Sequence, residues 1–240
     1  MQNEELVAAV LGHVNSLRDL LRCSAVSRCW RSATKILTPT SIEVPGVPYN
    51  QDIDISFDDI LQWLQQKHQQ QYFDKLQNFS LSLSNYAADD QPPVAASGLA
   101  TLMLAGLWPL KACSIDGPFD LYQIAGLLPH TLHHLHVQVD IDYRQYHKID
   151  IGIFQRFRSL RSLHLSAPES VKVAGFQMQS PMVLPNLRHL HLSPWPFKDS
   201  GTLANSLPQL THAALHIEAT DFKQYVKLPH IEYLGVQLVN

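Results

Sequence analysis

The chain has 240 residues, of which 45% are hydrophobic and 16% charged, and a formal net charge of −3. This length allows one large core or two unequal parts, and the charge gives no electrostatic reason to expect nucleic acid. No segment reaches the roughly 18 apolar residues of a membrane helix, and the N-terminus lacks the pattern of a signal peptide. Three scattered Cys residues cannot form a disulfide framework. We therefore expect a protein of the cytoplasm, the nucleus or both, with no membrane partner.

Residues 1–40 have the pattern of three short helices. Asn3 followed by Glu4 and Glu5 is typical of a helix start, with a capping side chain and acids in the first turn. Ser16 followed by Asp19 indicates a second start. A third helical stretch ends near Ile36. So small a module cannot bury its whole apolar surface, and we expect another surface to cover the remainder.

The order and spacing of these helices resemble the F-box over about residues 4 to 34. The most specific stretches run from Asp19 to Arg22 and from Val26 to Arg31, whereas Gln2 and Asn3 stand where the family has Leu-Pro. The resemblance implies docking to a Skp-family adaptor and, through it, to a cullin. It places six residues on the adaptor-binding face or in support of that face: Leu6, Val10, Leu20, Leu21, Val26 and Trp30. The alternative is that the helices only cap the part of the chain that follows.

Several prolines indicate a linker over residues 41–56, between this F-box-like module and the rest of the chain. After the linker, Ser56 is expected to start a helix with an apolar side that includes Phe57 and Leu64. We expect this helix to cover the first strand of the following domain.

The pattern L-x-x-L-x-L recurs seven times, with conservative replacements, in residues 76–240. Its fourth and sixth positions fall on the same face of a strand and predict a buried row. Apolar pairs such as Phe154 and Phe157 precede most strands and predict helical or 3₁₀ turns. The copies are Leu76, Phe79, Leu81; Leu110, Cys113, Ile115; Leu132, Leu135, Val137; Leu160, Leu163, Leu165; Leu187, Leu190, Leu192; Leu210, Ala213, Leu215; and Ile231, Leu234, Val236.

This pattern resembles the leucine-rich-repeat family over roughly residues 57–240, with about seven repeats. The expected fold class is therefore α/β: a leucine-rich-repeat solenoid preceded by a small three-helix F-box-like module. Its parallel sheet lies on the concave side, and helices or 3₁₀ turns lie on the convex side. The Asn ladder of the family is absent, which predicts an irregular solenoid. Val236 and Leu238 belong to a last strand without a polar cap, so we expect an open edge there.

Histidines gather at the positions that alternate with the buried row. We expect these side chains to form a substrate-binding surface on the concave face, stacked roughly 5 Å apart on neighbouring strands. As histidines, they are expected to make partner binding depend on pH between about 6 and 7.5. A His-rich metal site is an alternative, although no Cys, Asp or Glu converges with them. The expected binding residues are His134, His136, His164, His189, His191, His212, His216 and Tyr233.

The sequence contains no nucleophile elbow, phosphate-binding glycine loop or H-E-x-x-H motif. We therefore expect a non-catalytic binding protein without a cofactor. By resemblance, its function is to recognise a protein substrate for a cullin-RING (SCF-type) ubiquitin ligase. The alternatives are a repeat scaffold with no ubiquitin role and a His-rich metal-binding protein.

Overall fold

The computed structural model describes part of the chain. The described residues are 2–11, 13–14, 17–36, 40–44, 62, 64, 66, 73–82, 109–117, 121–139, 149–166, 176–177, 184–196, 206–218 and 230–239.

Three helices form the N-terminal module: α1 (Gln2–Leu11), α2 (Leu17–Val26) and α3 (Arg28–Ile36). The sequence prediction of three short helices is thus confirmed. Ser27 precedes α3, and its hydroxyl accepts a hydrogen bond of 3.3 Å from the backbone N–H of Trp30, which caps the helix. α3 packs against both α1 and α2, with Leu11, Leu20 and Ala33 buried.

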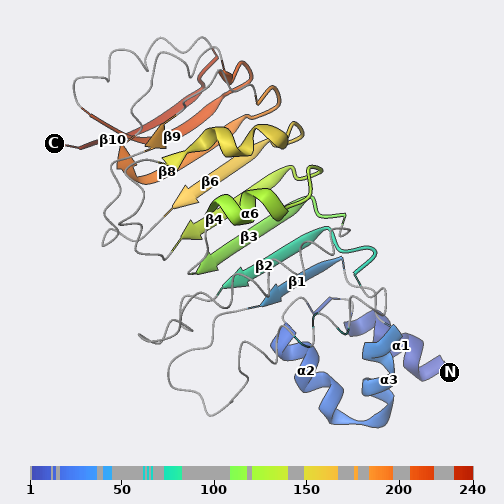
Figure 1. The fold of residues 1–240 in the computed structure, drawn as a ribbon. Coiled ribbons are helices and arrows are strands. Elements are labelled where there is room, and N and C mark those ends of the chain that lie inside the picture. Colours follow the sequence, from blue (N-terminus) through green and yellow to red (C-terminus); the bar gives the residue numbers. More distant parts are fainter. Residues whose placement is uncertain are drawn as a thin grey trace.

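The rest of the described chain is built around one parallel sheet of eight strands in the order β1-β2-β3-β4-β6-β8-β9-β10. Neighbours in the sheet therefore follow the chain order, and Figure 1 shows the strands side by side from the helical module to the C-terminal end. β1 and β10 are the two edge strands. The strands are β1 (Ser41–Val44), β2 (Asn78–Ser82), β3 (Ala112–Gly117), β4 (His134–Val139), β6 (Ser162–Ser166), β8 (His189–Pro196), β9 (His212–Glu218) and β10 (Tyr233–Val239).

The first strand corrects the expected boundary of the linker. Residues 41–44, assigned to a linker over 41–56, form β1 and pair in parallel with β2. Ile42 is buried and lies in register with Phe79. The Thr40 carbonyl accepts hydrogen bonds from the backbone N–H groups of Gln77 and Asn78. The sheet therefore starts immediately after the helices. The remainder of that linker lies outside the described residues, as does the helix expected from residue 57, except for residues 62, 64 and 66.

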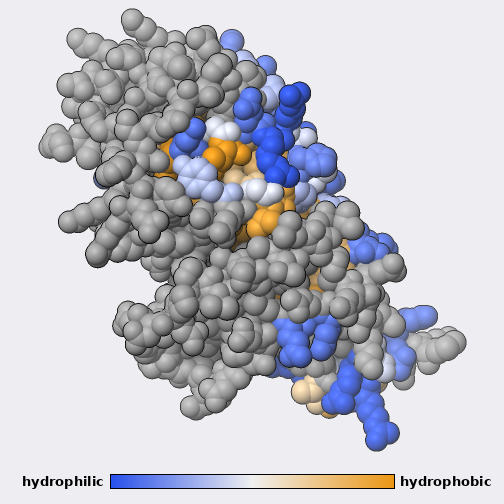
Figure 2. Space-filling view, viewed as in Figure 1, coloured by the Kyte–Doolittle hydropathy of each residue, from blue (hydrophilic) through white to orange (hydrophobic). Residues whose placement is uncertain are grey.

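Alternation along the strands places their apolar side chains on one face. The fourth and sixth positions of the first six sequence copies are all buried, as predicted. In the seventh copy Leu234 and Val236 are partly buried, as befits an edge strand. Helix α6 (Leu121–Leu127) and the 3₁₀ helix η1 (Ile151–Arg156) lie on the same side of the sheet (Figure 1). They contribute Ile124 and Phe154 to this core. Figure 2 shows hydrophobic side chains between hydrophilic ones on this helical side.

The same turn precedes five of the strands. In each, the backbone N–H of the first residue of the copy donates to the carbonyl three residues earlier. This bond closes a tight turn and brings the apolar first position inward, where all five side chains are buried. The donors are Leu76, Leu132, Leu160, Leu187 and Leu210, and the acceptors are Phe73, Pro129, Phe157, Leu184 and Leu207.

Two further features complete the described part. β5 (Ile149–Asp150) and β7 (Phe176–Gln177) form a separate parallel pair, which the sequence did not predict. Asp150 also caps η1, since its side chain accepts from the Gly152 N–H at 2.8 Å. No helix among the described residues has the length and apolar character required to cross a membrane.

Candidate binding face

The face of the main sheet opposite α6 and η1 carries the polar side chains that alternate with the core, and we call it the polar face. Strand register arranges these side chains in rows that cross the sheet. One row contains His136, His164, His191, Ala214 and Gly235. The other contains His134, Ser162, His189, His212 and Tyr233. Seven of the eight expected binding residues thus share two rows; His216 continues β9, and its side chain lies outside the description.

The first row contains a continuous stack of three imidazole rings. The ring centroids of His136 and His164 are 4.2 Å apart, and those of His164 and His191 are 4.0 Å apart with 7° between the planes. Parallel strands in register impose a spacing of about 4.8 Å, which places such rings in contact. The stacking expected from the sequence is confirmed.

The second row stacks at its C-terminal end. The rings of His189 and His212 have centroids 4.6 Å apart, and those of His212 and Tyr233 are 6.2 Å apart. Thr211 Oγ1 lies 2.8 Å from Nδ1 of His212 and fixes the orientation of that ring. Tyr233 is 59% exposed, so this row ends in an aromatic ring that is accessible to solvent.

Burial changes the titration of the stacked rings. The pKa of His164 is lowered to about 4, first by burial and then by the neighbouring His136 and His191. Burial also lowers the pKa values of His134, His136, His189 and His191, whereas Asp116 opposes the change at His136. The expected pH window of about 6 to 7.5 is therefore wrong for His164, and the transitions of the other four histidines move downward from the ordinary value. At neutral pH the stack presents uncharged rings.

Several polar atoms beside the stack retain hydrogen-bonding capacity. Ser114 Oγ lies 3.3 Å from Nδ1 of His136, and Ser82 Oγ donates to Asp116 Oδ2 at 2.9 Å. The remaining atoms, His136 Nε2, Asp116 Oδ1 and Ser166 Oγ, are buried without a hydrogen-bond partner in the described structure. Unpaired buried polar atoms are costly, so these three atoms reduce the stability of the fold around the stack.

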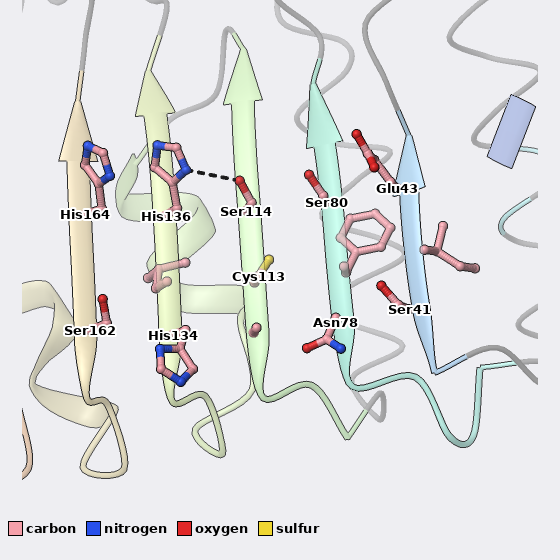
Figure 3. A pocket seen from close by; sticks show the side chains of 14 residues that line it. Ser41, Glu43, Asn78, Ser80, Cys113, Ser114, His134, His136, Ser162 and His164 are labelled. Carbon is pink, nitrogen blue, oxygen red and sulfur yellow. Dashed lines mark hydrogen bonds between the residues drawn. The ribbon is translucent and has the colours of Figure 1, made fainter. Parts of the chain in front are cut away.

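The polar face is hollowed over β1 to β6. The hollow has a volume of about 560 Å³ and includes His134, His136 and His164 along one side. Figure 3 shows these rings projecting from β4 and β6, while Ser80 and Glu43 project from β2 and β1. Ser114, Asp116 and Glu43 were not among the predicted binding residues. The sequence could have indicated these residues, because they alternate with buried positions along their strands. For Glu43 this alternation is hard to recognise, because its strand has only four residues.

The residues expected to face an adaptor fall into two groups. Leu6, Val10 and Val26 are exposed by 68%, 56% and 67%. Leu20 is buried and Trp30 is half-buried against the core, so these two support the module from inside. The side chain of Leu21 lies outside the described residues. Leu6 and Val10 are one helical turn apart and share a face of α1.

The histidine rows do not gather metal ligands in the described part of the chain. No three His, Cys, Asp or Glu side chains there converge on one point. Stacked imidazoles have parallel ring planes, so their nitrogen lone pairs run side by side rather than toward a common centre.

These features define the described architecture: a small helical module followed by a parallel sheet of eight strands with a histidine-lined polar face. No protein-family model matches the chain, and a search among curated proteins finds no match.

Proposed function

We propose that the chain is the substrate-recognition subunit of an SCF-type cullin-RING ubiquitin ligase. In this proposal α1 to α3 form an F-box that docks on a Skp-family adaptor and, through it, on a cullin. The polar face holds a protein substrate, and the chain itself is not catalytic and needs no cofactor. It acts in the cytoplasm, the nucleus or both.

The exposure of Leu6, Val10 and Val26 is the observation that carries the proposal. The helical module already has a core of Leu11, Leu20 and Ala33, so these three exposed side chains are not needed to close it. Burying apolar surface contributes about 25 cal/mol per Å². A helical partner surface that covers them gains that free energy, as the F-box resemblance implies.

We also propose that the sheet belongs to the leucine-rich-repeat class. The L-x-x-L-x-L copies align in register from β2 to β10. The repeated turn before five strands supports the same assignment. Stacked repeats of this kind contact mainly their neighbours, and their open sheet is a surface for proteins.

A second candidate function is a repeat scaffold without a role in ubiquitin transfer. It is favoured by the contact of α2 with β1, the first strand of the sheet. In that case α1 to α3 only cap the end of the sheet, which repeat proteins require for solubility.

Co-purification with a Skp-family adaptor separates the two functions. The wild-type chain is expected to retain the adaptor, and Leu6→Asp with Val26→Asp is expected to weaken retention by about tenfold or more, since buried charges at an interface are costly. Leu20→Asp is unsuitable, because Leu20 is 3% exposed and the change unfolds the module.

Tyr233→Asp is the control, because it places one such charge at an exposed aromatic on the sheet, outside α1 to α3. This control is expected to retain the adaptor. If the wild-type chain retains no adaptor, or the double variant binds as well as wild type, the ligase proposal is refuted and the scaffold function remains.

A further inference from the structure

Three cations lie along the border of the sheet at which its strands begin. Each occupies the position before the first strand residue of a copy: Lys111 before β3, Arg161 before β6 and Arg188 before β8. All three side chains are exposed. We call them the basic strip.

Backbone hydrogen bonds fix the spacing of this strip. The N–H of His133 donates to the Lys111 carbonyl, Arg161 to His133, and Arg188 to Arg161. The three cations and His133 thus occupy successive strands with a separation of about 4.8 Å per strand. Over three such steps the strip extends about 14 Å, which four or five residues of an extended peptide span.

The charges of the strip are not neutralised within the described structure. The ion pair found there joins Arg22 to Asp19, both on α2. Like charges on adjacent strands repel and cost stability, so the strip is unfavourable for the isolated fold. The nearest acid along the same border is Glu232, two strands beyond Arg188.

The positive charges of the basic strip act on histidines of the polar face. The positive charge of Arg161 contributes to the lowered pKa of His134, after burial and His133. Arg188 contributes likewise at His189, after burial and two neighbouring histidines, whereas Glu232 acts in the opposite direction. The cations therefore lie close to the rings and share one continuous surface with them.

We propose that the basic strip binds an acidic segment of a partner protein, a run of Glu or Asp side chains lying across β3 to β8. Guanidinium groups pair with carboxylates through charge-assisted and bidentate hydrogen bonds. The neutral rings beside the strip contact the uncharged part of the same segment. Glu232 limits the site, since it repels an acidic segment that extends toward β10.

This inference deepens the proposed function by naming the class of substrate, and it rests on that function only for calling the partner a substrate. Protein is favoured over nucleic acid because the chain is acidic overall, with a net charge of −3. Beyond the strip, the polar face contributes neutral imidazoles, hydroxyls and the carboxyl groups of Glu43 and Asp116 rather than further cations.

Fluorescence anisotropy tests the proposal with the full chain at low salt. The probe is a labelled peptide with six consecutive Glu residues, and its control has six Gln. The Glu peptide is expected to bind at least tenfold more tightly. Arg161→Gln with Arg188→Gln is expected to remove most of this difference. Arg28→Gln, which removes an exposed cation from α3, is expected to leave binding unchanged within twofold.

Two sign-specific variants sharpen the test. Glu232→Gln is expected to bind the Glu peptide as tightly as wild type or severalfold more tightly. Arg161→Glu with Arg188→Glu is expected to prefer a Lys peptide, which also shows that the variant remains folded. The proposal is overturned if the Glu and Gln peptides bind equally or if the double Gln variant has no effect. It is equally overturned if single-stranded DNA binds as tightly through the same arginines.

The experiment separates this inference from the ligase proposal. Neutralising Arg161 and Arg188 is expected to leave adaptor retention unchanged, because both residues lie outside α1 to α3. If the chain binds the acidic peptide but no adaptor, the proposal for the basic strip stands and only the ligase proposal is refuted. If the chain retains the adaptor but shows no preference for the Glu peptide, only the proposal for the basic strip is refuted.

Discussion

The imidazole rings of His164 and His191 are nearly parallel, with centroids 4.0 Å apart. They project from neighbouring strands in register, and His136 extends the stack on the other side of His164. The central ring is thus shielded on both faces. Its protonation is opposed first by burial and then by its two neighbours, so the ring is uncharged at neutral pH.

This arrangement predicts that the protein loses stability in acid. His164 has a pKa of about 4 in the fold, against 6.5 for an unperturbed histidine. Between these values the unfolded chain binds the proton more readily, so stability is present above 6.5 and is lost as pH falls toward 4. The melting temperature should decrease across this window, and NMR should show His164 titrating near its lower end.

His164→Gln should make the melting temperature depend less on pH over the same range. His13→Gln is the matched control, because His13 is exposed beyond α1 and outside the stack, and it should preserve the wild-type slope. Titration of His164 near pH 6.5, with no loss of stability in acid, would contradict the prediction.

Two Leu→Ala substitutions should differ sharply in how much they lower the free energy of unfolding. Leu163 is 1% exposed in the core, whereas Leu6 is 68% exposed on α1. Leu163→Ala leaves a cavity and should lower the free energy of unfolding by about 2–5 kcal/mol. Leu6→Ala should change it by less than about 0.5 kcal/mol. Urea denaturation measures both, and equal costs would mean that Leu163 is not in a packed core.

Two glycines should respond oppositely to alanine. Nothing lies within 4 Å of a Cβ added at Gly126, in α6, so Gly126→Ala should raise stability by about 0.5–1 kcal/mol. At Gly235 an added Cβ meets the Tyr233 hydroxyl at 3.2 Å and its ring carbon at 3.3 Å. Gly235→Ala should therefore displace the Tyr233 ring from His212. Thermal denaturation measures the first effect, and ring NOEs between residues 212 and 233 measure the second.

The three thiols should differ in reactivity. Cys113 is buried, and burial raises its pKa to about 12, so little of the reactive thiolate is present at pH 8. Cys23 and Cys29 are only half-buried. Iodoacetamide at that pH should modify these two in the folded protein, and Cys113 should react only after denaturation. Mass spectrometry of the modified peptides decides the order, and early labelling of Cys113 would show that β3 opens easily.

The core and the two histidine rows were predictable because they follow from one rule. Alternation in the L-x-x-L-x-L copies assigns residues such as Leu190 to the core and His189 and His191 to the opposite face. Parallel pairing then aligns equal positions of successive copies. The basic strip obeys the same rule, since Arg161 and Arg188 hold the second position of their copies, and it was missed because only the alternating positions were compared.

Other features required three-dimensional information. β1 has only Ile42 and Val44 as apolar residues, and prolines flank it at positions 39 and 45, which is typical of a linker. It becomes a strand because β2 supplies a hydrogen-bonding edge. The pKa of His164 depends on burial and on neighbours in other copies, so the residue type alone predicted a transition at too high a pH.

The early start of β1 also limits the distance between the helical module and the sheet. α3 ends at Ile36 and β1 begins at Ser41, so an extended chain allows their ends to separate by at most about 18 Å, and α2 touches β1. In the proposed ligase this short span makes the molecule a fixed-length spacer between cullin and substrate. Lengthening it by a few residues after Ile36 would leave both binding surfaces intact and yet shift which substrate lysines come within reach of the ubiquitin donor.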